Sequence, residues 1–526
     1  MFWDALVIVL YFAAILTIGL KKGGGEKSLE GYALGNRSIP WWAILASILA
    51  SEISAATFLG APGEGFALRN FTYLQLGIGT ILGRLVVGAL FIGPYYRHGV
   101  VSIYEFLGIR FGPLSRRAAS LVFLVTRALA SGTRLYVAAI LLVLAIEIAG
   151  GTTPTPAGEI AIFTGSVVVL VALTALYTAF GGIKAVIWTD LIQAGILVAS
   201  LAVTLGILFT RIPGGWHGAH ALLTAPDDLR VFDSGLLPGA KFFANVKGVL
   251  GQEYTLFAAF IASTFITLAT HGTDQDMVQR MLTAKNPRSG KLAVILSGLA
   301  DLPIAGAFVL IGILLWAFYQ THPDPHLPKE NPQVFAWFIL TQLPAGFRGL
   351  LVAGLLATAM GSLSTALNAL ATSFCRDFYL PTWGQKLGEA GRLRAIRCAT
   401  VGFAVVLTVI GVATARVVVA DPHARILPIV LGVFGYTYGS LLGLFLIGLF
   451  TERRGSDAGN VIAMVCGFLV VALLSGLPSD LAVLCGHAPF SQPDWLPLIA
   501  FPWRVFFGAV TTVAVGVLFR TPPQAA

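Results

Sequence analysis

The stretch LVAGLLATAMGSLSTALNALATSFCRDFY, residues 351–379, is apolar enough to cross a bilayer but carries hydroxyl and amide side chains in its middle. Lipid offers such groups no hydrogen-bond partner. Thr358, Gly361, Ser362 and Thr365 are spaced at i, i+3, i+4 and i+7, so on a helix they share one face. Oxygen ligands on one face suit an alkali cation. Close packing of small residues between membrane helices is the more common reason for such a face, so other segments must decide.

Composition places this chain in a lipid bilayer. Of its 526 residues, 56% are hydrophobic and 11% are charged, which is too apolar for a water-soluble domain. A helix crosses the hydrocarbon core in about 20 apolar residues. Runs of that kind predict an all-α polytopic fold with thirteen transmembrane helices, near residues 4–20, 43–64, 71–96, 117–148, 159–180, 184–210, 252–273, 289–318, 347–376, 395–416, 424–450, 458–476 and 499–519.

The basic residues predict the topology. The formal net charge is +9, and Lys and Arg gather on the cytoplasmic side of membrane helices, so topology explains this charge without a nucleic-acid partner. With the N-terminus outside, alternate loops collect the basic residues. We therefore expect a multi-pass protein of the plasma (inner) membrane with its N-terminus outside and its C-terminus in the cytoplasm. The four cysteines form no CxxC pair, which argues against a metal site or a disulfide frame.

An acidic side chain lies in the middle of the second expected span, which contains SEISAATFLGAPG. A carboxylate at that depth is costly unless it has a partner or faces water. We therefore expect Glu52 to face a cavity and to bind a solute there with Ser54 and Thr57. The alternative is a structural ion pair, for which Arg127 and Arg134 in the fourth span are available partners.

The seventh expected span, FAAFIASTFITLATHGTDQDMVQR, is the second polar-rich one. Ser263, Thr264, Thr267 and Gly272 weaken an uninterrupted helix there. Spans two and seven are five apart and cross in opposite directions, as an inverted five-plus-five repeat requires, with a broken first helix in each half and a binding site at the midplane. The three hydroxyl residues are therefore expected to line the same cavity as Glu52.

The sixth expected span opens with YTAFGGIKAVIWTDLIQ. Asp190 and Gln193 are spaced at i, i+3, one or two turns into the membrane. A carboxylate at this depth either neutralises a cation near the hydroxyl face that contains Ser362 or pairs with Lys184 or another basic residue at the helix end. The residues leave both interpretations open.

Five segments together resemble the sodium:solute symporter family. In the order that the family has them, they are SEISAATFLGAPG at 51, RLYVAAILL at 134, YTAFGGIKAVIWTDLIQ at 177, GTDQDMVQRMLTAKN at 272 and AMGSLSTALNALATSFCRDFY at 359. The resemblance implies the leucine-transporter-like fold, in which spans two to eleven form the inverted-repeat core and helices two and seven are discontinuous.

The resemblance also implies one sodium ion between spans two and nine. Carried over by position, its ligands are the backbone carbonyls of Ala50 and Ile53 and, from span nine, Thr358, Gly361 and Ser362. Family members usually have two adjacent hydroxyl residues where this chain has Gly-Ser, so one ligand side chain is missing. Either Thr358 or Thr365 supplies the missing ligand, or a water molecule does. Otherwise the coupling is weak or uses another ion.

Two further positions are matched by the resemblance. Asp190 corresponds to an aspartate that some relatives associate with ion passage or with a second sodium ion. Glu52 corresponds to an asparagine that touches the sugar in the sugar-transporting relatives.

The resulting expectation is a single transmembrane transporter domain, residues 1–526. It has an N-terminal peripheral helix and cytoplasmic loop at 1–42, the inverted-repeat core at 43–450 and two C-terminal peripheral helices at 451–526. Function is expected to be cation-coupled symport, with Na⁺ as coupling ion, of a small polar organic solute. The solute class stays open among a sugar, an amino acid, a monocarboxylate and a vitamin-like anion.

Other functions remain as alternatives. A solute sensor derived from a transporter, or a proton-coupled or uncoupled transporter of the same fold, fits the same residues. An enzyme is not expected, because the sequence has no catalytic cluster in the bilayer-spanning segments. No cofactor beyond the coupling cation is expected.

Overall fold

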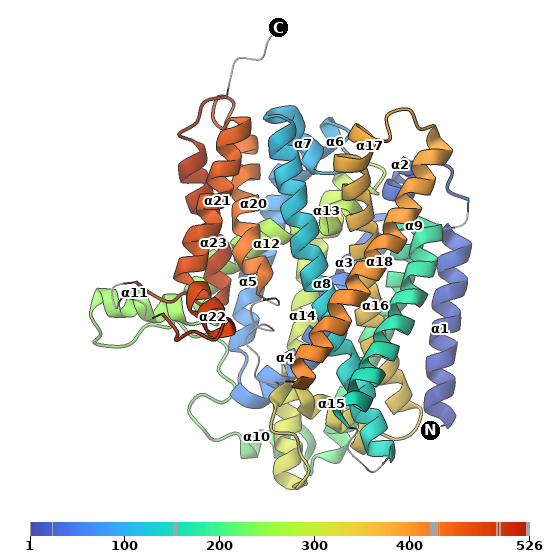
Figure 1. The fold of residues 1–526 in the computed structure, drawn as a ribbon. Helices are drawn as coiled ribbons and strands as arrows, with labels where there is room; N and C mark the ends of the chain where they lie inside the picture. Colours follow the sequence, from blue (N-terminus) through green and yellow to red (C-terminus); the bar gives the residue numbers. More distant parts are fainter. Residues whose placement is uncertain are drawn as a thin grey trace.

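The computed structural model describes residues 2–23, 25–150, 155–420, 430, 432–490, 493 and 496–521, and within these ranges the chain is helical apart from loops and two isolated β-bridges. Figure 1 shows an upright bundle with the two chain ends at opposite ends. The elements in order are α1 Phe2–Gly23, α2 Leu29–Leu34, η1 Gly35–Arg37, α3 Trp41–Glu52, α4 Ala55–Leu68, η2 Thr72–Gln75, α5 Leu76–Val86, η3 Val87–Phe91, α6 Ile92–Arg97, α7 Tyr104–Arg110, α8 Pro113–Gly150, α9 Pro156–Arg211, α10 Gly215–Leu222, α11 Phe242–Gly251, η4 Ala258–Ser263, α12 Thr264–Gly272, α13 Gln275–Leu282, α14 Pro287–Thr321, α15 Asn331–Gln342, α16 Phe347–Phe374, η5 Cys375–Tyr379, α17 Leu380–Thr382, α18 Glu389–Ala420, α20 Val433–Phe450, α21 Asp457–Leu474, α22 Leu477–Leu484 and α23 Phe501–Gly516.

The all-helical membrane architecture is confirmed, although helix length alone does not give thirteen spans. In the described part of the chain, nine helices are long and apolar enough to cross a membrane, or ten if the bent pair α3 and α4 counts as one span. Ala258–Gly272 and α23 are shorter apolar helices that lie where the seventh and thirteenth spans were expected. The 56-residue helix α9 covers two expected spans. The number thirteen therefore stays a prediction.

Helix α9 is broken at Gly182. This residue has φ 55° and ψ −153°, a combination that residues with a side chain rarely adopt. A β-carbon here would also lie 2.5 Å from the backbone oxygen of Tyr32. The GG pair of the sixth span thus turns the chain where the sequence analysis separated two helices.

The second expected span is broken as predicted. Helices α3 and α4 meet at an angle of 67°, and the two residues between them, Ile53 and Ser54, are extended. The hydroxyl of Ser54 caps α4 by accepting a hydrogen bond from the backbone N–H of Thr57 at 3.4 Å. Helix termini leave backbone groups without intrahelical partners, so this break exposes polar backbone in the middle of the bundle.

The seventh span is broken as well, directly after Gly272. Helix α12 ends at Gly272 and α13 begins at Gln275. The side chain of Asp274 caps α13 by accepting from the backbone N–H of Asp276 at 2.9 Å. Two interrupted helices are therefore present, as the sequence analysis expected.

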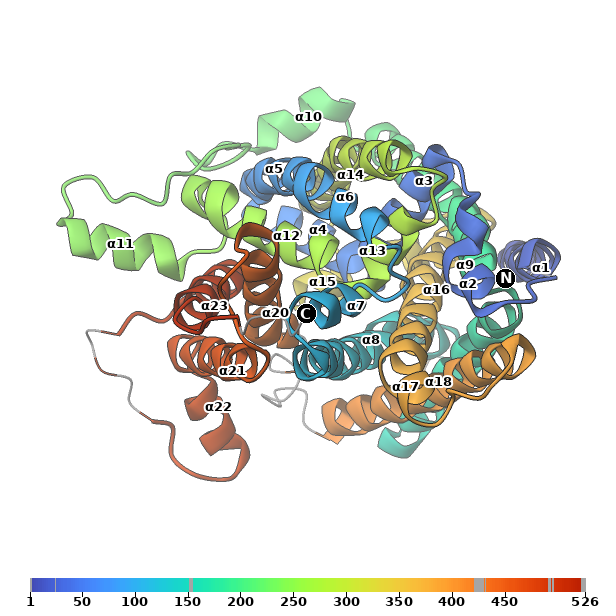
Figure 2. The same cartoon turned by 90° about the horizontal axis from the view of Figure 1, so that it is seen from above.

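Helix α16 lies inside the bundle. In its apolar window 89% of the residues are buried, against 22% for α1 at the periphery, and α16 packs on α9, α8, α3 and α13. Seen along the bundle in Figure 2, α13 and α15 lie near the middle, whereas α1 and α21 lie toward opposite sides. The hydroxyl-bearing helix thus reaches both broken segments.

Candidate functional site

A cavity of about 370 Å³ opens beside the two helix breaks. Its size suits a small organic molecule. Its wall comes from α3, α4, α5, α8, α12, α14 and α20, with α23 at one side. The polar and charged side chains on this wall are Ser51, Glu52, Thr57, Tyr73, Thr80, Arg127, Arg134, Ser263, Thr267, Thr270, His271, Asp274, Asp301 and Tyr438.

Glu52 is paired, but with an arginine that the sequence analysis did not consider. Both of its carboxylate oxygens accept hydrogen bonds from Nη2 of Arg84, which is fully buried on α5. Nη1 of the same arginine donates to the hydroxyl of Ser297 on α14 at 2.7 Å. Nε2 of His271 lies 3.6 Å from the Glu52 carboxylate. The alternative of an ion pair at Glu52 is therefore present, but its partner is Arg84 and not Arg127 or Arg134.

Arg127 instead stabilises the break in the seventh span. It forms an ion pair with Asp274, which also accepts a hydrogen bond from the hydroxyl of Tyr438 at 2.8 Å. A second ion pair joins Arg127 to Asp276 at 3.0 Å. Because each carboxylate in this group has a cationic partner, the cost of burying it is offset.

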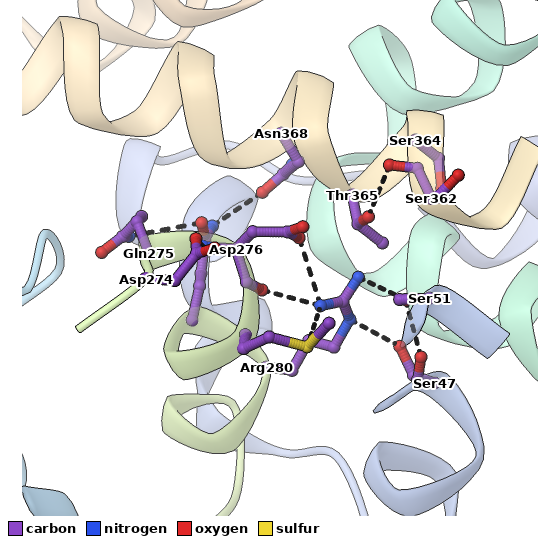
Figure 3. A network of polar contacts seen from close by, with 12 residues as sticks. Ser47, Ser51, Asp274, Gln275, Asp276, Arg280, Ser362, Ser364, Thr365 and Asn368 are labelled. Atoms are coloured by element: carbon purple, nitrogen blue, oxygen red, sulfur yellow. Dashed lines mark hydrogen bonds and ion pairs between the residues drawn. The ribbon is translucent and has the colours of Figure 1, made fainter. Parts of the chain in front are cut away.

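Arg280 joins the two broken helices. Its Nε donates to Ser47 at 3.0 Å and its Nη2 donates to Ser51, both on α3. On its own helix, Nη1 pairs with Asp276 at 3.1 Å. Figure 3 shows this guanidinium between α3 and α13, with the hydroxyl residues of α16 close by. A buried arginine with donors shared between both segments fixes how they meet.

The hydroxyl face of α16 lies directly against the end of α3. A β-carbon built on Gly361 would be 3.1 Å from the carbonyl oxygen of Ala50. Thr358, Ser362 and Thr365 each donate to a carbonyl of the preceding helical turn, at 2.8, 3.1 and 3.0 Å. Each hydroxyl oxygen keeps lone pairs that can still accept or bind a cation.

The place of the missing hydroxyl is taken by an amide. The same β-carbon on Gly361 would be 2.8 Å from Oε1 of Gln193 on α9. In the described part of the chain, no well-aligned hydrogen bond reaches either polar side-chain atom of this buried glutamine. An amide oxygen that can serve as an ion ligand is therefore present beside Gly361.

Asp190 is fully buried one helical turn away from Gln193. Its Oδ2 accepts from the Ser47 hydroxyl at 2.5 Å and lies 4.0 Å from Nε of Arg280. Its Oδ1 has no hydrogen-bond partner among the described residues. Lys184, the alternative partner, pairs with Glu26 at 2.6 Å. The basic residue beside Asp190 is therefore Arg280 and not Lys184.

Arg134 differs from the other cationic side chains at the cavity. Its guanidinium carbon lies 5.2 Å from the centroid of the Phe434 ring, and Arg127 lies over the same ring at the same distance. No carboxylate of a described residue pairs with Arg134, whereas Arg84, Arg127 and Arg280 each have one. A cation without a carboxylate thus lines the cavity.

Comparison with known proteins shows to which family this chain belongs. The family model "Sodium:solute symporter family" matches residues 32–467. The chain belongs to the sodium:solute symporter family. Coupling of solute transport to Na⁺ and a transporter function follow from this membership.

Several relatives of this symporter match nearly its whole length. It is 26% identical over 489 residues to the sodium/sialic acid symporter SiaT of Proteus mirabilis (strain HI4320), covering 91% of this chain and 90% of that one. It is 27% identical over 482 residues to the sodium-coupled monocarboxylate transporter 1 of Homo sapiens, covering 89% and 72%.

Solved structures agree on the fold. A substrate-bound, outward-open Na⁺-coupled sialic acid symporter superposes with a TM-score of 0.80 at 22% identity, covering 98% of this chain and 97% of that one. Mhp1, a nucleobase-cation-symport-1 family transporter in a closed conformation, superposes with a TM-score of 0.50 at 14% identity, covering 92% of each chain. The symporter has the leucine-transporter-like fold.

The symporter brings most of the expected solute-binding residues to the cavity. Glu52, Thr57, Ser263 and Thr267 line it. Ser54 caps α4 instead, and Thr264 donates to the backbone oxygen of Phe260 at 2.7 Å; neither is on the cavity wall.

Sequence reasoning missed several polar residues of the symporter's site. Arg84 and Asp301 are charged residues inside the apolar runs ILGRLVVG and SGLADLPI, and ionisable residues at such depth are a recognised sign of function. Gln193 was noted for its spacing from Asp190 but was given no role. Tyr438 carried no signal, because an isolated tyrosine in an apolar helix is common in any membrane protein.

Proposed function

We propose that this symporter carries a small organic solute bearing a carboxylate, together with Na⁺, into the cell. The observation that carries the proposal is Arg134, a guanidinium at the cavity that no carboxylate of a described residue neutralises. An unpaired charge at membrane depth is costly, and such residues commonly mark the position of a charged substrate. A solute carboxylate is the ligand that a guanidinium binds best, through two parallel N–H···O bonds.

The neighbouring charges support a role in solute binding for Arg134 and not for Arg127. Arg127 already has Asp274 and Asp276 as partners, so an incoming carboxylate would compete with them. Phe434 carries both guanidinium groups on one ring, which holds Arg134 in place without using its N–H donors. Those donors remain for a solute.

The relatives point in the same direction. Two of the similar proteins are named for transport of sialic acid and of monocarboxylates, and both names denote carboxylic acids. A shared cationic subsite is a simple reason for one fold to serve both.

We further propose that Na⁺ binds between α16 and the break in the second span. The ligands are the carbonyl oxygens of Ala50 and Ile53 and the oxygens of Thr358 and Ser362, with Oε1 of Gln193 in the place of the hydroxyl that Gly361 lacks. Thr365 and Asp190 lie around this group and add to its negative potential. Five hard oxygen atoms suit Na⁺.

Coupling follows from linkage. Na⁺ held between α16 and the end of α3 stabilises the conformation in which these elements touch, and a solute that prefers that conformation then binds more tightly. The ion shifts the conformational equilibrium by no more than its difference in affinity for the two states.

The orientation proposed is N-terminus outside and C-terminus in the cytoplasm of the plasma membrane. The basic loops support it, as does the position of the two chain ends at opposite ends of the bundle (Figure 1).

Uptake into proteoliposomes tests the proposal. Under an inward Na⁺ gradient, labelled pyruvate or N-acetylneuraminate is expected to accumulate, and replacing Na⁺ by choline is expected to abolish accumulation. Arg134→Gln should lower uptake by about 30-fold or more, because a buried charge partner is lost. Arg230→Gln, in an outer loop, is the matched control and should transport normally. Accumulation of neither acid, or equal accumulation by Arg134→Gln, contradicts the proposal.

A further inference from the structure

One carboxylate at the cavity has no partner. Asp301 lies in the middle of α14 and lines the cavity with Leu302 and Ala305. No hydrogen bond or ion pair joins it to any residue that the structure describes. A carboxylate at this depth, like the guanidinium discussed above, requires a partner or water.

The nearby cations are already engaged. Arg84, the nearest guanidinium on the neighbouring helix α5, is held by Glu52 through Nη2 and by Ser297 through Nη1 at 2.7 Å. His271 lies 3.6 Å from Glu52. The cationic side chains near Asp301 therefore neutralise Glu52. The Asp301 carboxylate remains available to a ligand that enters the cavity.

Asp301 and Arg134 come from different walls. Asp301 is on α14, which packs on α3, α4 and α5, and Arg134 is on α8, which packs on α16, α18 and α20. Seen along the bundle, α14 and α8 lie on opposite sides of α13 and α15 (Figure 2). Among the described residues, the cavity thus has one negative and one positive side chain without an ion-pair partner, each in a separate half of its wall.

We propose that the solute is zwitterionic: its carboxylate binds Arg134 and an ammonium or other cationic group binds Asp301. This inference rests on the proposed function, because it assumes that Arg134 takes the carboxylate. Binding such a solute neutralises both unpaired side chains at once, and no net charge from the solute is added to the membrane interior. A solute with a carboxylate alone leaves Asp301 unpaired and binds more weakly.

Matched probes distinguish the two charges. The melting temperature of purified full-length protein is measured in detergent with saturating NaCl. Three compounds of equal length are compared, namely hexanoate, 6-aminohexanoate and hexylamine. The comparison is repeated with the corresponding four-carbon and eight-carbon compounds. A ligand raises the melting temperature according to its affinity. At the length that spans the two sites, the amino acid is expected to stabilise at about tenfold lower concentration than the plain carboxylate, which corresponds to one charged hydrogen bond. The amine alone is expected to give no shift.

Variants assign the preference to Asp301. Asp301→Asn should remove the advantage of the amino acid while it leaves the affinity for the plain carboxylate nearly unchanged. Asp301→Glu keeps the charge on a longer side chain, so it should keep the preference and move it to a shorter probe. Asp227→Asn, in an exposed outer loop, is the charge-matched control and should behave as the wild type.

The outcomes separate this inference from the proposed function. Na⁺-dependent stabilisation by carboxylates with no preference for the amino acids overturns the zwitterion and leaves the carboxylate in place. Stabilisation by none of the probes counts against both. A preference for the amino acid that persists in Asp301→Asn overturns the assignment to Asp301. Uptake of plain carboxylates driven by a proton gradient also overturns it, because Asp301 would then bind a proton and not an ammonium group.

Discussion

The side-chain oxygen of Gln193 lies 2.8 Å from the point where a β-carbon on Gly361 would be, and the carbonyl oxygen of Ala50 lies 3.1 Å from the same point. An amide oxygen from α9 thus lies where the family resemblance led us to expect a hydroxyl on α16. The glycine and the glutamine are complementary, because a side chain at 361 requires the glutamine to move.

Replacing Gln193 tests whether its amide acts as a sodium ligand. Gln193→Ala should raise the Na⁺ concentration for half-maximal uptake by about tenfold, because one oxygen ligand is lost. The double variant Gly361→Ser with Gln193→Ala supplies a hydroxyl in the vacated space and should recover most of this loss. Gly361→Ser alone should lower the melting temperature. A Na⁺ dependence unchanged in Gln193→Ala would remove this residue from the site.

Ser362→Ala should weaken sodium dependence more than solute recognition. Ser362 follows Gly361, which lies against the carbonyl of Ala50 at the end of α3, and it is not on the wall of the large solute cavity. Its removal should therefore take away an ion ligand and leave the Arg134 side chain available to the solute. Uptake is titrated with Na⁺ at fixed solute and with solute at saturating Na⁺. Equal loss in both titrations would mean that the cation has been misplaced.

Arg280→Met should destabilise the fold strongly. The substitution keeps much of the side-chain volume but leaves the Asp276 carboxylate without one of its two cations and removes the donors to Ser47 and Ser51. Breaking a buried charge network of this kind costs about 3–5 kcal/mol. The melting temperature of purified protein measures the effect, and Arg230→Met, at a 40% exposed side chain, is expected to melt like the wild type.

Gly182→Ala should destabilise α9, whereas Gly195→Ala in the same helix should not. At Gly182 a side chain meets both an unfavourable φ of 55° and the backbone of Tyr32, a strain of about 1–3 kcal/mol. At Gly195 a β-carbon has no heavy atom within 4 Å, so alanine should be neutral or stabilising by up to about 1 kcal/mol. Equal melting temperatures for the two variants would contradict the break at Gly182.

The fold was predictable because lipid enforces strict rules on sequence. The Gly-Gly pair at 181–182 lies between two expected spans, and the break in the second span was expected from the inverted repeat. Ser54, which was expected to bind the solute, proved to be the N-cap at that break. The break in the seventh span follows Gly272, one of the residues that the sequence analysis named, whereas the hydroxyl residues around Ser263 line the cavity from the helix before it. An N-cap aspartate was the better signal.

The partners of buried charges were not predictable. Glu52, Arg84, Arg127 and Arg134 all lie in apolar runs, and periodicity gives the face of each helix only relative to its own axis. Which arginine meets Glu52 depends on how α3, α5 and α8 pack in three dimensions. Gln193 was given no role for the same reason, because only the packing of α9 against α16 brings it beside Gly361.

Influx of ²²Na⁺ tests the central claim most directly, since it requires no labelled solute. Proteoliposomes are given ²²Na⁺ outside together with unlabelled pyruvate, N-acetylneuraminate or 6-aminohexanoate. We predict a saturable rise in ²²Na⁺ influx with at least one of these acids in the wild type and no rise in Arg134→Gln. An influx that ignores all three acids, or that rises equally in Arg134→Gln, would contradict coupled transport of Na⁺ with a carboxylate at Arg134.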